Sequence, residues 1–315
     1  MTWSEDSLHR WLCKQPKAAC LSGSQGHDAA VLKTQMGRPV LCVDSCVESV
    51  HFAAGASAKA VGRKAAGRAL SDLAATGAKP GALLLALRAP AEARQKRLHD
   101  FIRGVGEMGA AHGAPLVGGD TTCAPGPCSL SVSALGSYLR PGKPPGRDRA
   151  RTGQLVAVTG PLGGSLLGRH LKIRPRIEEA AWLLDLGASA LMDVSDGLLL
   201  DLERLARASG VAVELNDVPI HRDAKRRARS TGQSPLQHAL CDGEDYELIA
   251  CLPYKTKDQM LDEAAKQCPG LKIIGRVRQG VGVGLQNLEG LGSLSSGNIF
   301  GTLHGKGWLH GTRKN

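Results

Sequence analysis

Aspartates recur at the ends of apolar stretches and in glycine-rich breaks of this sequence. The six are Asp28, Asp44, Asp72, Asp120, Asp193 and Asp196. One such aspartate, for example Asp196 before an apolar helix, is usually a helix cap or a turn former. Six carboxylates in apolar surroundings need positive charge, and no Lys or Arg stands beside most of them. We therefore expect several Mg²⁺ ions, because carboxylate oxygen suits Mg²⁺ and neither the histidines nor the cysteines have zinc-ligand spacing.

Glycine-rich turns accompany the aspartates, in VGGDTT at 117–122 and TGPLGG at 159–164. Backbone amides of such turns can bind phosphates, so metal-binding aspartates beside them predict phosphoryl transfer. The sequence has no G-x-x-x-x-G-K-[ST] motif, and GVGEMG at 104–109 ends a helix instead of opening one after a strand. The prediction is a phosphate site without a P-loop or a dinucleotide fingerprint.

The elements that must position these residues alternate between strand and helix patterns, which predicts an α/β fold. We expect strands at 38–47, 81–87, 114–119, 129–139, 155–160, 190–194, 211–216, 246–252 and 271–278, and helices at 58–78, 91–113, 197–210, 221–230 and 256–267. Whether strands such as 211–216 pair in parallel stays open. A length of 315 residues favours two domains, which we place at 1–140 and 151–315 with a Pro- and Gly-rich linker at 141–150.

The net charge of +11 suits an anionic ligand, nucleic acid or simple solubility. The densest basic run, 221–230, contains no aromatic residue, so we interpret it as a solvated helix face and expect no nucleic-acid partner. The N-terminus lacks a signal-peptide pattern, and no stretch approaches a membrane span. We expect a cytoplasmic protein with reduced thiols and no membrane partner, in which Cys42 and Cys46 are structural.

Several segments resemble the thiamine-monophosphate kinase family. They are GHDAAVL, VDSCVESVHF, ALSDLAATGAKP, VGGDTT, MDVSDGLLLDLERLARASG, DGEDYEL, IGRVRQG and GKGWLH, within residues 26–310. DVSDGL with GEDYEL separates this family from aminoimidazole ribonucleotide synthetase, selenophosphate synthetase and hydrogenase maturation factor HypE, which share its superfamily. The resemblance implies the two-domain fold of that superfamily, in which an N-terminal sheet with helices pairs in a homodimer and a C-terminal α/β domain completes the phosphate and substrate site. It also implies ATP-dependent phosphorylation of thiamine monophosphate to thiamine diphosphate, with several Mg²⁺ ions.

The resemblance also implies roles for single residues. It assigns the six aspartates to metal binding, with Asp120, Asp193 and Asp196 also catalytic; it places Gly119, Asp120, Ser195 and Arg147, or else Arg149, against ATP, and His51, Glu244 and Trp308 against thiamine phosphate. Each substrate residue has another interpretation: Trp308 as a packing residue, His51 as a structural histidine and Glu244 as a turn former.

Departures from the family pattern stand beside these residues: His27 replaces an aspartate, Val43 a Thr or Ser, Ser49 a glycine and Asp242 the first glycine of GGEDYEL. Since the neighbouring ligands are retained, we expect a divergent but active member. The alternatives are another ATP-using reaction of the superfamily, a weakened homologue that binds thiamine phosphate or nucleotide without turnover, and a basic nucleic-acid-binding protein.

Overall fold

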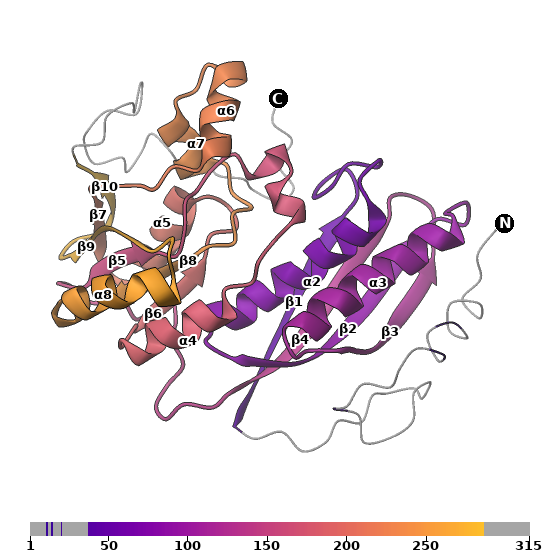
Figure 1. Cartoon of the computed structure of the whole chain (residues 1–315), viewed down its shortest axis with the longest axis horizontal. Coiled ribbons are helices and arrows are strands. Elements are labelled where there is room, and N and C mark those ends of the chain that lie inside the picture. Colours follow the sequence, from indigo (N-terminus) through magenta and orange to yellow (C-terminus); the bar gives the residue numbers. More distant parts are fainter. Residues whose placement is uncertain (1–10, 12–13, 15–19, 21–36, 287–315) are drawn as a thin grey trace. The chain divides into compact units, whose positions relative to one another are not determined.

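A computed structural model describes residues 37–286 together with Trp11, Lys14 and Cys20 (Figure 1). Asp28, His27 and Trp308 lie outside the described residues. The described part divides into two compact units. The first consists chiefly of residues 37–73, 78–141 and 171–173, and the second of residues 74–77, 142–170 and 174–286.

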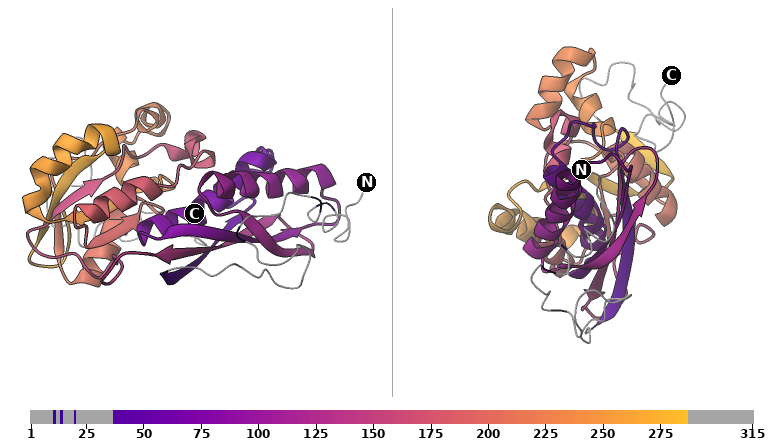
Figure 2. Two further views of the ribbon diagram at one scale, coloured as in Figure 1. Left: turned by 60° about the horizontal axis from the view of Figure 1, so that its bottom comes forward. Right: turned by 90° about the vertical axis from the view of Figure 1, so that its right-hand side faces the viewer.

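The first unit is a four-stranded sheet with two helices on one of its faces (Figure 2). Its elements are β1 (Arg38–Val47), α2 (Ala58–Ala75), β2 (Lys79–Ala89), α3 (Gln95–Ala111), β3 (Leu116–Cys123) and β4 (Ser129–Tyr138). The strand order is β1-β4-β2-β3. Among neighbouring strands, β2 and β3 pair in parallel and the other two pairs are antiparallel. Both central strands therefore present alternate side chains to the helices.

The two faces of this first sheet differ in what covers them. On the helix-covered face, Leu85 and Val132 are buried in a core with α2 and α3. On the other face, Leu41, Val43 and Leu84 are 74%, 65% and 43% exposed. We call this second side the open face. It carries apolar side chains at strand positions where a solvated sheet usually carries polar ones.

The second unit is a six-stranded sheet with helices on both faces. Its elements are β5 (Leu155–Val158), α4 (Ile177–Asp185), β6 (Ala190–Asp193), α5 (Leu198–Ser209), β7 (Ala212–Leu215), α6 (Arg222–Thr231), α7 (Pro235–Cys241), β8 (Leu248–Leu252), α8 (Lys257–Gln267), β9 (Lys272–Arg278) and β10 (Gly282–Leu285). The order is β10-β7-β9-β5-β8-β6, and only β7 and β10 pair in parallel. One core lies between the sheet and α5 and α7, and another lies between the sheet and α4 and α8.

The α/β fold expected from the sequence is confirmed, and each of the expected strands and helices overlaps a described one. No element was expected at α7 or at β10. The strand at 211–216, whose pairing was open, has an antiparallel neighbour in β9 and a parallel one in β10. Within the described residues, no helix is long and apolar enough to cross a membrane.

Candidate active site

Two loops of the second unit run side by side beyond the ends of paired strands. We call them the VSDG loop and the DGEDYE loop; they are residues 194–197, after β6, and 242–247, before β8. The Tyr246 amide donates to the Val194 carbonyl at 2.9 Å, and the Glu244 amide donates to the Ser195 carbonyl at 2.7 Å. The antiparallel pairing of β6 with β8 thus continues into the loops and fixes their register.

The backbone of the DGEDYE loop has unusual dihedral angles. Gly243 has a φ of +73°, and a Cβ there would lie 2.8 Å from the Ser195 carbonyl oxygen. Glu244 and Tyr246 have φ values of +56° and +54°, which residues other than glycine rarely adopt, and both residues are buried. Such backbone strain persists only where the surroundings determine the conformation, and it is typical of functional loops.

Carboxylates gather around the VSDG loop. Asp193, Asp196 and Asp201 are all buried, and Arg204 forms ion pairs with both Asp196 and Asp201. Burial, followed by the charge of Asp193, raises the pKa of Asp201 to about 7. Arg204 thus neutralises charge on two of these carboxyl groups, Asp196 and Asp201.

Asp201 was not predicted as a site residue. Its Oδ2 atom accepts hydrogen bonds from the amides of Ser195 and Asp196, both at 3.0 Å, and its Oδ1 atom accepts one from Arg204 at 2.9 Å. The only sequence signal is a carboxylate in the apolar run LLLDL, one turn into α5. Periodicity does not reveal that this side chain turns back toward the preceding loop.

The TGPLGG turn serves a different purpose from the one expected. The Gly163 amide donates to both carboxylate oxygens of Asp245 at 3.0 Å, and the Gly164 amide donates to Asp242 at 2.8 Å. Arg169 donates to Asp245 at 2.6 Å, while burial raises the pKa of this carboxyl to about 7. The expectation that this turn binds phosphate is wrong for these two amides, because protein carboxylates occupy the anion position.

Asp242, where the family has glycine, fits its position without strain. Its φ of −68° is helical, so glycine is not required there. Its carboxylate lies 2.9 Å from His238 Nδ1 and, as stated, accepts from the Gly164 amide. The Asp242 side chain therefore links α7 to the glycine-rich turn, and its presence does not disturb the backbone of the DGEDYE loop.

In the first unit, Asp44 has a positive partner. Arg68 from α2 donates to both oxygens of the Asp44 carboxylate at 2.8 Å. The sequence has no Lys or Arg beside most of the aspartates, but in the fold Asp44 is paired with Arg68 and Asp196 with Arg204. Both arginines lie in helices and are distant in the sequence from their aspartates, so inspection of neighbouring residues does not reveal these pairs. Asp72 lies half-buried in α2, one turn beyond Arg68.

Asp120 lies on the opposite side of the sheet from Asp44. Asp120 pairs with Ala86 and Ala86 with Ser131, which places Asp120 on the open face. Asp44 pairs with Val132, whose side chain is in the core under the helices. Since paired residues share a face, the sheet separates these two carboxylates instead of bringing them together.

Gly119 and Asp120 belong to an exposed stretch of β3. A Cβ at Gly119 would lie 1.9 Å from the Leu85 carbonyl oxygen, so only glycine allows β3 to approach β2 this closely. Asp120 Oδ2 accepts a hydrogen bond from Thr122 Oγ1 at 3.3 Å. Gly118, Gly119 and Asp120 are all exposed, whereas Val117 is partly buried.

His51 lies in a tight turn after β1. The Val47 amide donates to its Nδ1 atom at 3.0 Å, so the proton of the neutral ring is on Nε2. The buried Lys64 donates to the His51 carbonyl at 2.6 Å. Ser49 in this turn has a φ of +66°, which explains why the family has glycine there. His51 thus has a structural role, and its Nε2–H group is the donor suited to a phosphate.

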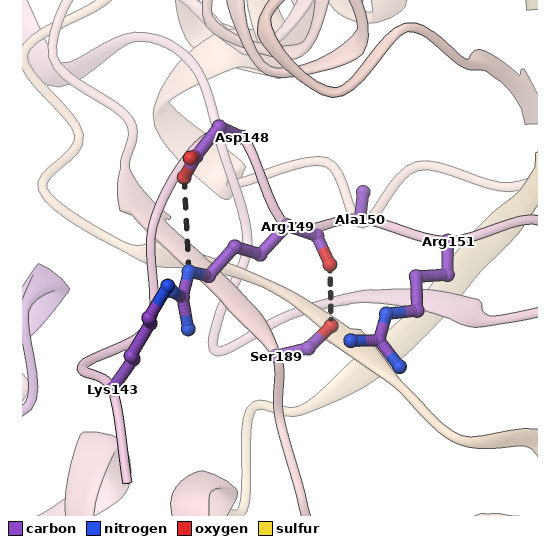
Figure 3. A pocket seen from close by; sticks show the side chains of 6 residues that line it. All are labelled: Lys143, Asp148, Arg149, Ala150, Arg151 and Ser189. Carbon is purple, nitrogen blue, oxygen red and sulfur yellow. Dashed lines mark hydrogen bonds and ion pairs between the residues drawn. The ribbon is translucent and has the colours of Figure 1, made fainter.

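The loop before β5 forms a basic pocket of about 390 Å³ (Figure 3). It is lined by Lys143, Asp148, Arg149, Ala150, Arg151 and Ser189. Ser189 Oγ donates to the Arg149 carbonyl at 2.8 Å, and Figure 3 shows this serine between the Arg149 and Arg151 side chains. Arg149, rather than Arg147, therefore lines this pocket.

The described residues bear on three other expectations. They contain no group of three or more His, Cys, Asp or Glu side chains that could hold a metal ion by themselves. In α6, the basic run has exposed Lys225, Arg226 and Arg229, as expected for a solvated helix face. Cys42 and Cys46 are structural, as expected: Cys46 is fully buried and Cys42 Sγ contacts the Ala69 carbonyl at 3.2 Å.

Comparisons with known proteins identify the family. Residues 26–138 match the model of the AIR synthase related protein N-terminal domain, and residues 150–286 match that of its C-terminal domain. The chain is 41% identical over 219 residues to thiamine-monophosphate kinase of Rhodopirellula baltica, covering 68% of each protein.

Solved structures agree. Thiamine-monophosphate kinase from Stenotrophomonas maltophilia superposes with a TM-score of 0.76 at 31% identity, covering 91% of this chain and 98% of that one. AaThiL complexed with AMPPCP and TMP superposes with a TM-score of 0.72 at 27% identity, covering 97% and 95%. This chain belongs to the thiamine-monophosphate kinase family.

Proposed function

We propose that this protein transfers the γ-phosphoryl group of ATP to thiamine monophosphate, giving thiamine diphosphate and ADP. The observation that carries the proposal is the pairing of the VSDG and DGEDYE loops, which holds buried Asp193, Asp196 and Glu244 in one unit. These loops contain the segments that distinguish the family within its superfamily. AaThiL, which has a similar fold, has been solved with AMPPCP and TMP.

In this reaction the protein mainly has to position the two substrates and neutralise their negative charge. A phosphate oxygen of thiamine monophosphate is anionic at neutral pH and attacks the γ-phosphorus in line, so no general base is needed. His51 donates from Nε2 to the substrate phosphate, and the Glu244 carboxylate faces the cationic thiazolium. Trp308, which lies outside the described residues, stacks on the heterocycle in this proposal.

Magnesium fits the carboxylates of both units. Mg²⁺ commonly takes one or two carboxylates, with waters and substrate phosphates as its other ligands, so the absence of a larger cluster among residues 37–286 agrees with this mode. Asp193 and Asp196 would hold it in the second unit. In the first unit, Asp44 and Asp72 on the helix-covered side and Asp120 on the open face would hold separate ions. When bound, Mg²⁺ offsets the repulsion between the two phosphate-bearing substrates.

For the ATP phosphates, we propose Arg149 in the basic pocket as a contact, with Arg147 beside it. Lys143, Arg149 and Arg151 contribute three positive charges to the pocket against one from Asp148. Arg149→Ala should raise the KM for ATP by about tenfold, the cost of a charge-assisted hydrogen bond. If only Arg147→Ala raises this KM, Arg147 is the contact and the pocket has no part in ATP binding.

We also propose a homodimer formed through the open face. Leu41, Val43 and Leu84 expose apolar surface on one side of a sheet, where Val43 replaces the family's Thr or Ser. A twofold interface would bury this surface against its own copy. The first domain would then serve ATP and Mg²⁺ binding and dimerisation, and the second would complete the phosphate and substrate site. We expect the protein to be cytoplasmic.

The test is ADP release by the purified protein with ATP, excess Mg²⁺ and thiamine monophosphate, with a control lacking thiamine monophosphate. Release that depends on thiamine monophosphate, with thiamine diphosphate as product, is the expected result. Binding of either substrate by calorimetry without turnover would overturn the proposal in favour of a binding protein. ADP release that depends on another acceptor would indicate a different reaction of the superfamily.

A further inference from the structure

We infer that Asp201 is a positioning residue for the phosphate site: it fixes the VSDG loop so that Asp193 and Asp196 are held ready for the metal-bound substrates. This inference rests on the proposed function and adds a residue to it. Asp201 is fully buried, and both of its oxygens are engaged.

The reach of the hydrogen bonds separates this role from ordinary helix capping. Helix α5 begins at Leu198 with Gly197 as its N-cap, and Asp201 lies in its first turn. In a capping box, a first-turn side chain reaches back only to the amide of the N-cap residue. Asp201 Oδ2 instead accepts from the amides of Ser195 and Asp196, which lie before the N-cap, and so closes the preceding loop.

Asp201 also connects the two signature loops. The peptide groups at Ser195 are held on both sides, since the Ser195 amide donates to Asp201 and the Ser195 carbonyl accepts from Glu244. Arg204 bridges Asp201 and Asp196, which fixes the Asp196 carboxylate as well as its amide. A shift of Asp201 would therefore move Asp196 directly and Glu244 through one peptide.

Asparagine is the informative substitution at this position. Its oxygen could accept the same two amide hydrogen bonds, but its NH₂ group would then face the Arg204 guanidinium, so the bridge from Arg204 to Asp196 would be lost.

The experiment compares Asp201→Asn with the wild-type protein and with a matched control, Glu203→Gln. Glu203 lies on the same helix and pairs with Arg207 at 3.8 Å, away from the VSDG loop. Affinity for Mn²⁺ in the presence of AMPPCP is measured by calorimetry, and kcat and the KM for thiamine monophosphate are measured separately.

We expect Asp201→Asn to weaken Mn²⁺ binding by about 10-fold or more, the usual cost of losing an outer partner of a metal ligand. The KM for thiamine monophosphate should change less than the Mn²⁺ affinity, because Asp201 contacts Asp196 directly and reaches Glu244 only through the Ser195 peptide. Raising the Mg²⁺ concentration should recover part of kcat. Glu203→Gln should leave all of these values unchanged.

Mn²⁺ affinity within about twofold of wild type in a folded Asp201→Asn protein would overturn the inference. Should Asp201→Asn not fold, Arg204→Lys provides the second variant: a lysine keeps the charge but lacks the fork that bridges two carboxylates, and weaker Mn²⁺ binding is again expected. If the wild-type protein binds Mn²⁺ with AMPPCP but shows no turnover, the proposed kinase activity fails while the binding comparison still tests Asp201.

Discussion

The two units hold their candidate site residues in different ways. In the second unit, the VSDG and DGEDYE loops are joined by backbone hydrogen bonds, and Asp201 and Asp245 fasten them from within the same unit. In the first unit, Asp44 and Asp120 lie on opposite faces of one sheet, and Asp120 is exposed on the open face. The second unit is therefore preorganised by its own chain, whereas we propose that a second copy of the protein covers the open face of the first unit.

The largest expected effect concerns that cover. A double variant, Leu41→Glu with Leu84→Glu, places charges on the open face, and a twofold interface contains each change twice. Each buried charge costs at least about 1–3 kcal/mol, so the dimer dissociation constant should rise by at least about 100-fold. Light scattering after size-exclusion chromatography measures the mass. Leu261→Glu, which changes a 51% exposed leucine of the second unit, is the control and should leave the mass unchanged.

A wild-type protein that is monomeric at every concentration would remove the proposed dimer. The exposed apolar side chains of the open face would then have no explanation. The first unit would also need no second copy for its proposed role.

The next effect separates catalysis from stability in the first unit. Asp120→Asn should lower kcat by at least about tenfold, because it removes charge from the proposed metal site. Its thermal midpoint should stay within about 2 °C, since asparagine has nearly the same size and its oxygen can still accept the hydrogen bond from Thr122. A kinetic assay and a thermal melt of the same sample measure both. Normal turnover would show that exposed Asp120 has no part in the reaction.

The helices and strands of this protein, and the residues next to its motifs, could be predicted from the sequence. Strands and helices follow from apolar spacing, as in α2, where Val61, Ala65, Ala69 and Leu73 recur at helical intervals and are all buried. The adjacent Gly119 and Asp120 follow from the turn chemistry of VGGDTT.

Partners made by side chains that reach across the fold were not predictable. Arg68 contacts Asp44 from 24 residues away, and Asp245 contacts Gly163 across 82 residues. A sequence pattern shows which face of a helix or strand a residue occupies. It does not show which charged side chain of another element contacts that residue in the fold. For the same reason the sequence did not reveal that Asp201 reaches back to the VSDG loop.

A pH dependence of stability tests the fastening of the second unit. The pKa values of Asp201 and Asp245 are both raised to about 7, whereas aspartates in an unfolded chain titrate near 4. Between about pH 4 and 7 the folded state therefore binds more protons than the unfolded state, and stability falls as the pH rises through this window. Asp245→Asn removes one of the two groups.

Thermal melts from pH 5 to pH 8 should show a smaller loss of stability for Asp245→Asn than for the wild-type protein, by several degrees. Equal slopes for the two proteins would mean that Asp245 is ionised throughout and fully compensated by Arg169.

The smallest effect concerns a family departure in the first unit. Ser49 adopts a φ of +66°, where glycine has no steric penalty. Ser49→Gly should stabilise the protein by at most about 1 kcal/mol, because relief of strain is partly offset by the greater entropy of the unfolded chain. Urea unfolding curves measure this difference. A loss of stability would show that the Ser49 side chain contributes more than its backbone costs.

The central claim is that the paired loops of the second unit carry the kinase chemistry. The most direct measurement is the rate of thiamine diphosphate formation from ATP and thiamine monophosphate by Asp193→Asn, compared with the wild-type protein and with Asp262→Asn, an exposed change on α8. We predict a rate at least about tenfold lower for Asp193→Asn, with a folded protein and a normal rate for Asp262→Asn. A wild-type rate in Asp193→Asn would contradict the assignment of the site to these loops.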